Sequence, residues 1–288
     1  MVQAAVGVDR WAERRRRTEE LRERRPFARE LLDFYGALLS VQEDAFRDAV
    51  ATRPPPDLLD AYVAELVIPA IVDVTVAAGP ATLRAAAGGR QEEGDLRATV
   101  KTWLLGDPLP PVDTFLARAA AGPVLEALDD RAAAAFAGGR PERSCPRCGG
   151  WPQLSYFAPA GEDLATGPRR LMCSRCGATW GYARMTCAAC GEDSSARLTI
   201  FSEEGTASGE RGTVVRGLPA GDRRDAPTAV FPHVRVEACE TCKRYLLNID
   251  LAADGSAVPL VDEMTAIPLD LFARERGFSK ITPNLMGF

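Results

Sequence analysis

The sequence predicts an α+β fold in two domains. Residues 1–140 are expected to form an α-helical bundle, and residues 141–288 a domain with two four-cysteine metal-binding subdomains and a C-terminal helix. The length of 288 residues is typical of about two domains. All eight cysteines lie between Cys145 and Cys242. The residues before them are rich in Ala, Leu, Arg and Glu, and their apolar side chains recur at the three- and four-residue steps of helices.

The helices of the first domain are expected to follow one another with short breaks, as in an all-α bundle. Apolar residues between positions 31 and 46 fall on one helical face, and Pro54-Pro55-Pro56 ends that helix. Asp57 is expected to cap the next helix, whose apolar stretch at 66–78 is predicted to be buried. Further helices are expected at 96–104, around Phe115 and at 125–136. Gly138-Gly139-Arg140-Pro141 is the expected linker between the domains.

A basic run, Arg14-Arg15-Arg16-Arg17, lies near the N-terminus, with glutamates mixed into it. Their spacing allows ion pairs along a helix, so a solvated helical face is the expected structure. The run does not resemble an export signal, because no uncharged apolar stretch follows it. The apolar stretches are short or interrupted, so no membrane span is expected and the protein is predicted to be cytoplasmic.

The second domain differs from the first in its expected secondary structure. Short runs of β-forming residues at 154–157, 198–201 and 245–251 alternate with glycine, proline and charged turns, and are expected to be strands. Residues 262–278 are expected to be helical, with Met264 and Leu271 on one side. Pro268 favours a regular helix after it rather than before it, and Gly277 is the expected C-cap.

Each cysteine belongs to a Cys-x-x-Cys pair. The pairs are Cys145/Cys148, Cys173/Cys176, Cys187/Cys190 and Cys239/Cys242. In a reducing compartment such pairs indicate metal or redox chemistry rather than disulfides. Two such turns together supply four sulfurs in the tetrahedral arrangement that zinc or iron accepts, so two metal ions per chain are expected. A glycine follows three of the pairs, which fits a turn with a positive φ. Lys243 follows the fourth, where a strained or differently shaped turn is expected.

Two orders of pairing are compatible with the spacing. The sequential order joins the first pair with the second and the third with the fourth, and it is favoured. An interleaved order, first with third and second with fourth, is the alternative, because ten residues separate Cys176 from Cys187. Trp151 and Trp180, beside the turns, are expected to belong to the cores of the metal subdomains rather than to a contact surface.

The chemistry of the sites is restricted by the single histidine, His233. Schemes that need two histidines are excluded, and His233 is expected to be a structural residue beside a strand. Zinc and iron both accept four thiolates, and a complete shell of four leaves no position for a water or substrate. No catalytic residue is therefore predicted, and the protein is not expected to be an enzyme.

The charge gives no sign of a nucleic-acid partner. The net charge is -5, and the segment from Cys145 to Cys242 contains eleven basic and eleven acidic residues. A surface that binds phosphates normally carries an excess of basic side chains, so a zinc-ribbon protein that binds nucleic acid is the least favoured alternative.

The four Cys-x-x-Cys pairs, together with the C-terminal segment, resemble the formate dehydrogenase accessory protein FdhE family. The residues that carry the resemblance are Cys145-Pro-Arg-Cys-Gly149, Cys173-Ser-Arg-Cys-Gly-Ala-Thr-Trp180, Cys187-Ala-Ala-Cys-Gly191, Glu237-Ala-Cys-Glu-Thr-Cys-Lys-Arg-Tyr245, Asp262-Glu-Met-Thr-Ala-Ile-Pro-Leu-Asp-Leu271, Gly277-Phe278 and Pro283-Asn284. The resemblance runs from about residue 20 to the end and is most specific from Cys145 onward.

This resemblance implies a cytoplasmic accessory or maturation factor that binds the catalytic subunit of respiratory formate dehydrogenase and is required for that enzyme to become active. It also implies rubredoxin-like, zinc-ribbon-like metal subdomains, with iron as the metal. The leading alternative is a rubredoxin-like one-electron carrier, although a carrier has little need of the helical domain.

Overall fold

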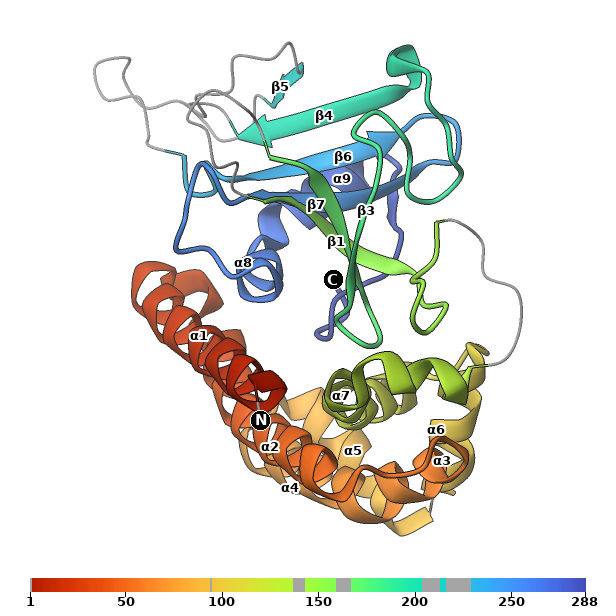
Figure 1. Cartoon of the computed structure of the whole chain (residues 1–288). Helices are drawn as coiled ribbons and strands as arrows, with labels where there is room; N and C mark the ends of the chain where they lie inside the picture. Colours follow the sequence, from red (N-terminus) through yellow and green to blue (C-terminus); the bar gives the residue numbers. More distant parts are fainter. Residues whose placement is uncertain (1, 94, 137–142, 159–166, 204–212, 216–228) are drawn as a thin grey trace. The chain divides into compact units, whose positions relative to one another are not determined.

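A computed structural model describes residues 2–93, 95–136, 143–158, 167–203, 213–215 and 229–288 (Figure 1). It confirms the predicted α+β class, with helices in the first part of the chain and a sheet with two late helices in the second. The predicted linker, Gly138-Gly139-Arg140-Pro141, lies outside the described residues. The chain divides into one unit of residues 1–150, 175–178 and 285–287, and a second of residues 151–174, 179–284 and 288.

The helices of the first unit form a bundle in which α2 contacts α1, α4 and α7. Leucines of α2 and α7, among them Leu38, Leu39 and Leu116, are fully buried between these helices. Asp95 caps α6 by accepting the N–H of Ala98 at 2.9 Å. The helices are α1 (Val2–Arg24), α2 (Arg29–Thr52), α3 (Leu59–Tyr62), α4 (Ile68–Ala78), α5 (Ala81–Glu93), α6 (Leu96–Leu105) and α7 (Pro111–Leu128).

Shorter helical elements link some of these helices. They are the 3-10 turns η1 (Pro26–Ala28), η2 (Pro56–Leu58) and η4 (Asp129–Ala135), and the π-helical turn η3 (Val63–Val67). The expected cap at Asp57 is wrong, because Asp57 lies inside η2 and the element has no side-chain cap. The helix expected around Phe115 is α7, which contains Pro123 and extends to Leu128, and most of the helix expected at 125–136 is instead the 3-10 element η4.

The apolar stretch at 66–78 is only partly buried, which corrects the prediction of a buried helix. Ile68, Ile71 and Val72 are buried, whereas the side chain of Leu66 is 66% exposed. In the part of the chain that the structure describes, one helical stretch, Pro56–Ala78, is long and apolar enough to cross a membrane. Core helices of globular proteins pass the same test, and here the stretch is broken into η2, α3, η3 and α4.

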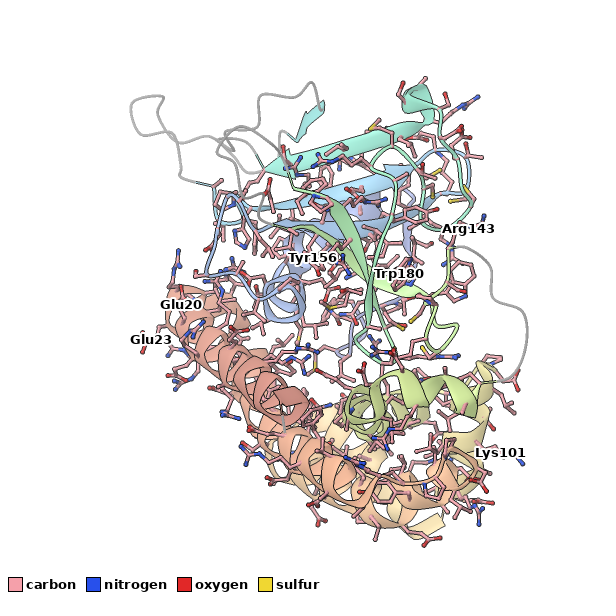
Figure 2. All side chains as sticks on the ribbon, viewed as in Figure 1. Glu20, Glu23, Lys101, Arg143, Tyr156 and Trp180 are labelled. Atoms are coloured by element: carbon pink, nitrogen blue, oxygen red, sulfur yellow. The ribbon has the colours of Figure 1, made fainter. Side chains whose placement is uncertain are left out.

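The basic run near the N-terminus is only partly the solvated face that the sequence predicts, because Arg16 is exposed whereas Arg14 and Arg17 are buried. Arg14 and Arg17 are buried on α1, because each has a carboxylate partner. Arg14 donates to both oxygens of Glu126 on α7 at 3.1 Å, and Arg17 pairs with Glu20 one turn along α1. Figure 2 shows the side chain of Glu20 near the end of α1, where its exposed fraction is 34%. A buried guanidinium is tolerated when its charge is paired in this way.

The second unit is built on a single sheet in the order β3-β2-β1-β7-β6-β4-β5, with β8 paired to β7. The three predicted strands are confirmed as parts of β1, β4 and β7. The strands are β1 (Pro152–Phe157), β2 (Arg169–Cys173), β3 (Thr179–Gly181), β4 (Leu198–Glu203), β5 (Thr213–Val215), β6 (Val234–Cys239), β7 (Arg244–Asp250) and β8 (Ser279–Lys280). The pair β6 and β7 is antiparallel, and β1 joins β7 in parallel (Figure 1).

The two faces of the sheet differ because side chains alternate along each strand. On β7, Tyr245, Leu247 and Ile249 belong to the main core, which also contains Leu269 and Phe278. Leu246 instead joins Leu171 and Ala188 in a smaller cluster, against which Trp180 packs.

The predicted C-terminal helix is two helices, α8 (Pro259–Thr265) and α9 (Ile267–Glu275), which meet at Ala266. Pro268 stands in the first turn of α9, as expected, but a regular helix also precedes it. Gly277 ends α9 with a φ of 80°, and the N–H of Phe278 reaches back to the carbonyl of Ala273. Met264 is buried, whereas the side chain of Leu271 is 48% exposed, so the two residues expected on one side of a helix differ in burial.

A network of buried charges connects these helices to the sheet. The ammonium of Lys280 contacts the carboxylates of Glu263 on α8 and Asp270 on α9, and all three side chains are at most 1% exposed. Tyr245 of β7 donates to Asp270 at 2.8 Å, and Gln153 of β1 donates to Glu263 at 2.9 Å. Two carboxylates therefore share one cation and two neutral donors, which compensates their removal from water.

Lys280→Met is expected to lower the free energy of unfolding by about 3–5 kcal/mol near neutral pH, because it leaves two buried carboxylates without their cation. Burial raises the pKa of Glu263, and Lys280 opposes that rise. In the variant the folded state therefore binds a proton at Glu263 more tightly than the unfolded state does. Stability then increases as the pH falls toward the ordinary carboxyl pKa, so the loss is expected to shrink at about pH 5. Urea unfolding near neutral pH and at about pH 5 measures the loss of unfolding free energy under the two conditions.

The exposed Lys101 of α6, labelled in Figure 2, provides the matched control. Lys101→Met is expected to leave the unfolding free energy unchanged at both pH values. An equal loss at both pH values in Lys280→Met would contradict the role assigned to Glu263.

Candidate metal centres

The eight cysteines gather into two groups of four. In each group the four sulfur atoms lie within 4.8 Å of one another. One group is Cys145, Cys148, Cys173 and Cys176, here called the closed cluster; the other is Cys187, Cys190, Cys239 and Cys242, here called the open cluster. The sequential order of pairing is confirmed, and the interleaved alternative is wrong. The two orders differ in which turns the strands bring together, and a spacing along the chain does not decide that.

The sulfur separations fit a tetrahedral metal ion. A metal–sulfur bond of about 2.3 Å places the sulfurs of a tetrahedron about 3.8 Å apart. The sulfurs of Cys145 and Cys176 are 3.7 Å apart, as are those of Cys187 and Cys242 and those of Cys190 and Cys239. Four sulfurs with no nitrogen or oxygen donor among them are the ligand set that structural zinc and rubredoxin-type iron accept. Each cluster could therefore hold one metal ion.

Three of the Cys-x-x-Cys turns have the same backbone hydrogen bond, from the residue after the second cysteine to the carbonyl of the first. The donors are Gly149, Gly191 and Lys243, each at 2.9 Å. The glycines that follow the first three pairs all have positive φ, between 64° and 83°, as predicted. Lys243 has a φ of 55°, so the fourth turn keeps the same shape and places an L-residue in the left-handed region.

The thiols of the open cluster influence one another. Burial raises the pKa of Cys187 and of Cys242, and neighbouring sulfurs add to the rise. Burial also acts to raise the pKa of Cys239, but the N–H groups of Cys242 and Thr241 outweigh it and lower that pKa. One sulfur of the cluster thus ionises readily, while its neighbours resist a second negative charge. A bound cation removes this conflict, because it neutralises the thiolates.

The closed cluster is bordered by arginines that lie inside its own turns. Arg147 pairs with Asp129 and Asp130 of η4. Arg175 lies 5.6 Å from the ring of Trp103 and donates to the carbonyl of Leu104 at 3.4 Å. Both turns are therefore fastened to the end of the helical bundle by a residue between the two cysteines. No role for these arginines was predicted. A basic residue inside both turns, Cys-Pro-Arg-Cys and Cys-Ser-Arg-Cys, was the feature of the sequence that could have indicated it.

Gly106 allows Arg175 to approach α6. Its φ is 88°, and a Cβ there would lie 2.6 Å from the Nη2 atom of Arg175. The glycine therefore satisfies two requirements at once, the left-handed end of α6 and the space that the guanidinium occupies.

The open cluster is fastened by short polar contacts between its two turns. Thr241 donates to the carboxylate of Glu192 at 2.6 Å, and Glu192 is itself held within the first turn, where its carbonyl accepts the N–H of Cys187 at 2.8 Å. The N–H of Glu240 donates to the carbonyl of Arg197 at 2.9 Å. These contacts join the turn after β3 to the turn between β6 and β7.

His233 lies directly before β6 and is buried. Its Nε2 is 2.8 Å from Asp262, and its Nδ1 is 4.0 Å from Asp254, so ligand-type atoms of three residues come close together. The two ring nitrogens point away from each other, so one ion is not able to take both. The 2.8 Å contact has the length of a hydrogen bond, and Asp262 also accepts the N–H of Val258 at the start of α8. This geometry supports the structural role expected for His233.

The two tryptophans beside the turns differ. Trp180 packs against the smaller hydrophobic cluster, as expected. The side chain of Trp151 is 43% exposed, so the expectation that it belongs to a core is wrong. The sequence shows both residues beside a cysteine turn but does not show which one the sheet covers.

Comparison with known proteins finds similarity to FdhE proteins. The model of the FdhE C-terminal domain matches residues 222–286. A Protein FdhE homolog from Aquifex aeolicus is 33% identical over 50% of this chain and 41% of that protein, so the matched region spans less than half of this relative. A second homolog, from Pseudomonas aeruginosa, is 29% identical over 89% of this chain and 78% of that protein. The chain is thus similar to FdhE proteins, and its C-terminal part matches the FdhE C-terminal domain.

The fold of this chain agrees with a solved structure. The crystal structure of the FdhE protein from Pseudomonas aeruginosa superposes with a TM-score of 0.61 at 24% sequence identity, and it covers 96% of this chain and 95% of that chain. The region matched by the C-terminal domain model contains the turn Cys239–Cys242 and the charged residues Glu263, Asp270 and Lys280. The predicted resemblance to this family is confirmed.

Gly191→Ala and Lys243→Gly are expected to change stability in opposite directions. The alanine places a Cβ at a φ of 83° and is expected to lower the free energy of unfolding by about 1 kcal/mol. The glycine removes the left-handed L-residue at position 243 and is expected to raise it by about 1 kcal/mol. Thermal unfolding of both variants at equal metal content measures the two shifts. Shifts of the same sign would contradict the equivalence of the two turns.

Proposed function

We propose that this protein binds two metal ions, one in the closed cluster and one in the open cluster, with iron or zinc as the metal. The support is the agreement between the 3.7 Å sulfur separations and a tetrahedral four-thiolate shell. The ligands in the proposal are Cys145, Cys148, Cys173, Cys176, Cys187, Cys190, Cys239 and Cys242. When bound, each ion would supply the positive charge that holds its four thiolates together.

Cys148→Ser and Cys190→Ser are each expected to lower the metal content from two ions to one per chain, because each removes a ligand from a different cluster. Elemental analysis with titration of free thiols measures this. Loss of both ions in either single variant would contradict independent sites, and a wild-type content of one ion or none would contradict the double site.

The function that these sites support best is that of a cytoplasmic accessory factor in the maturation of formate dehydrogenase, which binds the catalytic subunit of that enzyme. The observation that carries the proposal is the pair of complete four-cysteine clusters in a chain similar to FdhE proteins. Clusters of this kind fix turns and strands relative to one another, so they organise a surface for a partner. In this proposal the bound metal stabilises a binding surface and does not take part in a reaction.

The same donor set argues against catalysis at these positions. A catalytic zinc site normally keeps one position for water or substrate, whereas four cysteines fill the shell. No side chain is therefore assigned a catalytic role in this proposal.

A one-electron carrier is the second candidate, and the exposed edge of the open cluster favours it. Cys190 is exposed and Cys242 is half-buried, so a redox partner would be able to come close to this cluster. A reversible one-electron couple of the iron-loaded protein, together with electron transfer to a reductase, would favour the carrier over the accessory factor.

Capture of the formate dehydrogenase catalytic subunit by the tagged full-length protein tests the leading proposal. Cys148→Ser and Cys190→Ser are expected to weaken capture at least about tenfold, because loss of one metal loosens the turns that fasten the strands. Metal content is measured on the same samples.

Lys101→Ala on α6 is the matched control and is expected to capture the subunit as the wild type does. Undiminished capture by a double variant that lacks both metals would contradict a surface organised by the metals.

A further inference from the structure

The two clusters differ in how far they are shielded from water. All four residues of the closed cluster are buried, with exposed fractions between 0% and 2%. In the open cluster only Cys187 and Cys239 are buried, while Cys190 is exposed and Cys242 is half-buried. Two sulfur ligands of one site are thus near the surface, and those of the other site are enclosed.

The shield of the closed cluster is built from side chains of its own turns and of the helical bundle. Arg147 lies between Asp129 and Asp130, and its side chain is 19% exposed. Arg175 lies against Trp103, and its guanidinium is also 5.8 Å from the ring of Phe136. A competing ligand would have to displace these contacts before it reached a sulfur.

The turns of the open cluster have no comparable shield among the described residues. The residues that follow Cys190 are partly or fully exposed from Gly191 to Arg197, and Thr241 and Lys243 in the opposite turn are exposed. The contact between Thr241 and Glu192, which joins the two turns, is itself exposed to water. Local opening at such contacts costs less than opening of a buried core.

A cavity gives a second approach to the open cluster. It lies against Cys187 and Cys239. Three arginines line it, Arg169, Arg184 and Arg244, whereas Glu237 is its only acidic lining residue among those described. Arg169 is held by Glu237 at 2.5 Å, and the described lining carries three basic side chains against one acidic side chain. An anionic ligand would be attracted to this cavity.

We propose that the open cluster is the exchangeable metal site of this protein, where anionic chelating ligands and thiols from solution compete with Cys190 and Cys242, and that the closed cluster retains its metal as a structural site. The proposal rests on the two metal sites proposed above. It assigns different tasks to two clusters with identical ligand sets. Metal occupancy of the open cluster would then depend on the chelating ligands and thiols in solution, while the turns of the closed cluster keep their metal and stay fixed.

Metal release from the zinc-loaded full-length protein tests this proposal. With an excess of the anionic chromogenic chelator 4-(2-pyridylazo)resorcinol, zinc is expected to leave in two phases of one ion per chain, with rates at least roughly tenfold apart. Alkylation by iodoacetamide after the fast phase, followed by peptide mass spectrometry, is expected to label the cysteines of the open cluster and spare those of the closed cluster. Release of both ions in one phase, or early labelling of Cys145 or Cys148, would overturn the proposal.

Two arginine variants test the cavity and the shield separately. Arg184→Ala is expected to slow the fast phase with the anionic chelator but not with neutral 1,10-phenanthroline, and Arg175→Ala is expected to speed the slow phase. Lys101→Ala, on the exposed surface of α6, is the control and is expected to change neither phase. If Arg175→Ala left the slow phase unchanged, the shield assigned to the closed cluster would be wrong. A starting content below two zinc ions per chain would contradict the two-site proposal itself, and this inference with it.

Discussion

The four sulfur atoms of each cluster, held within 4.8 Å of one another, constrain the structure around them more than any other feature of this protein. Burial raises the pKa values of Cys187 and Cys242, and the neighbouring sulfurs add to the rise, so these two thiols resist ionisation. Each cluster also needs two turns of the same left-handed shape, and strands that deliver those turns to one point. The positive φ at Gly149, Gly177 and Gly191, and even at Lys243, is the local consequence of that requirement.

Charge pairing supports this arrangement in both units. In the first, Glu126 on α7 binds Arg10 and Arg14 of α1, and Arg147 pairs with the aspartates of η4. In the second, Lys280 lies between two buried carboxylates that belong to α8 and α9. Pairs with this degree of burial are expensive to break, because removing one partner leaves an uncompensated charge. They favour one packing of helices and strands over others, and so they fix where the cysteine turns lie.

The difference between the clusters arises from their neighbours and not from their ligands. Both have the same sulfur donors and the same turn, yet arginines and helix ends enclose one, while exposed turns and a basic cavity border the other. Identical donor sets with different surroundings can differ in solvent access and in ease of exchange. A structural metal site and an exchangeable metal site can therefore occur in one chain.

The α+β class, the eight cysteines as a set, the positive φ after the first three pairs and the resemblance to FdhE proteins could all be predicted from the sequence, because each depends on residue type and short spacing. Only the tertiary structure decided which turns pair, because that depends on the order of strands in the sheet. It also reversed the expected exposure of Arg14, Arg17, Leu66 and Trp151, since burial depends on partners far away in the chain. The enclosure of one cluster and the exposure of the other belong to the same class of property, because they arise from contacts between residues that no local pattern connects.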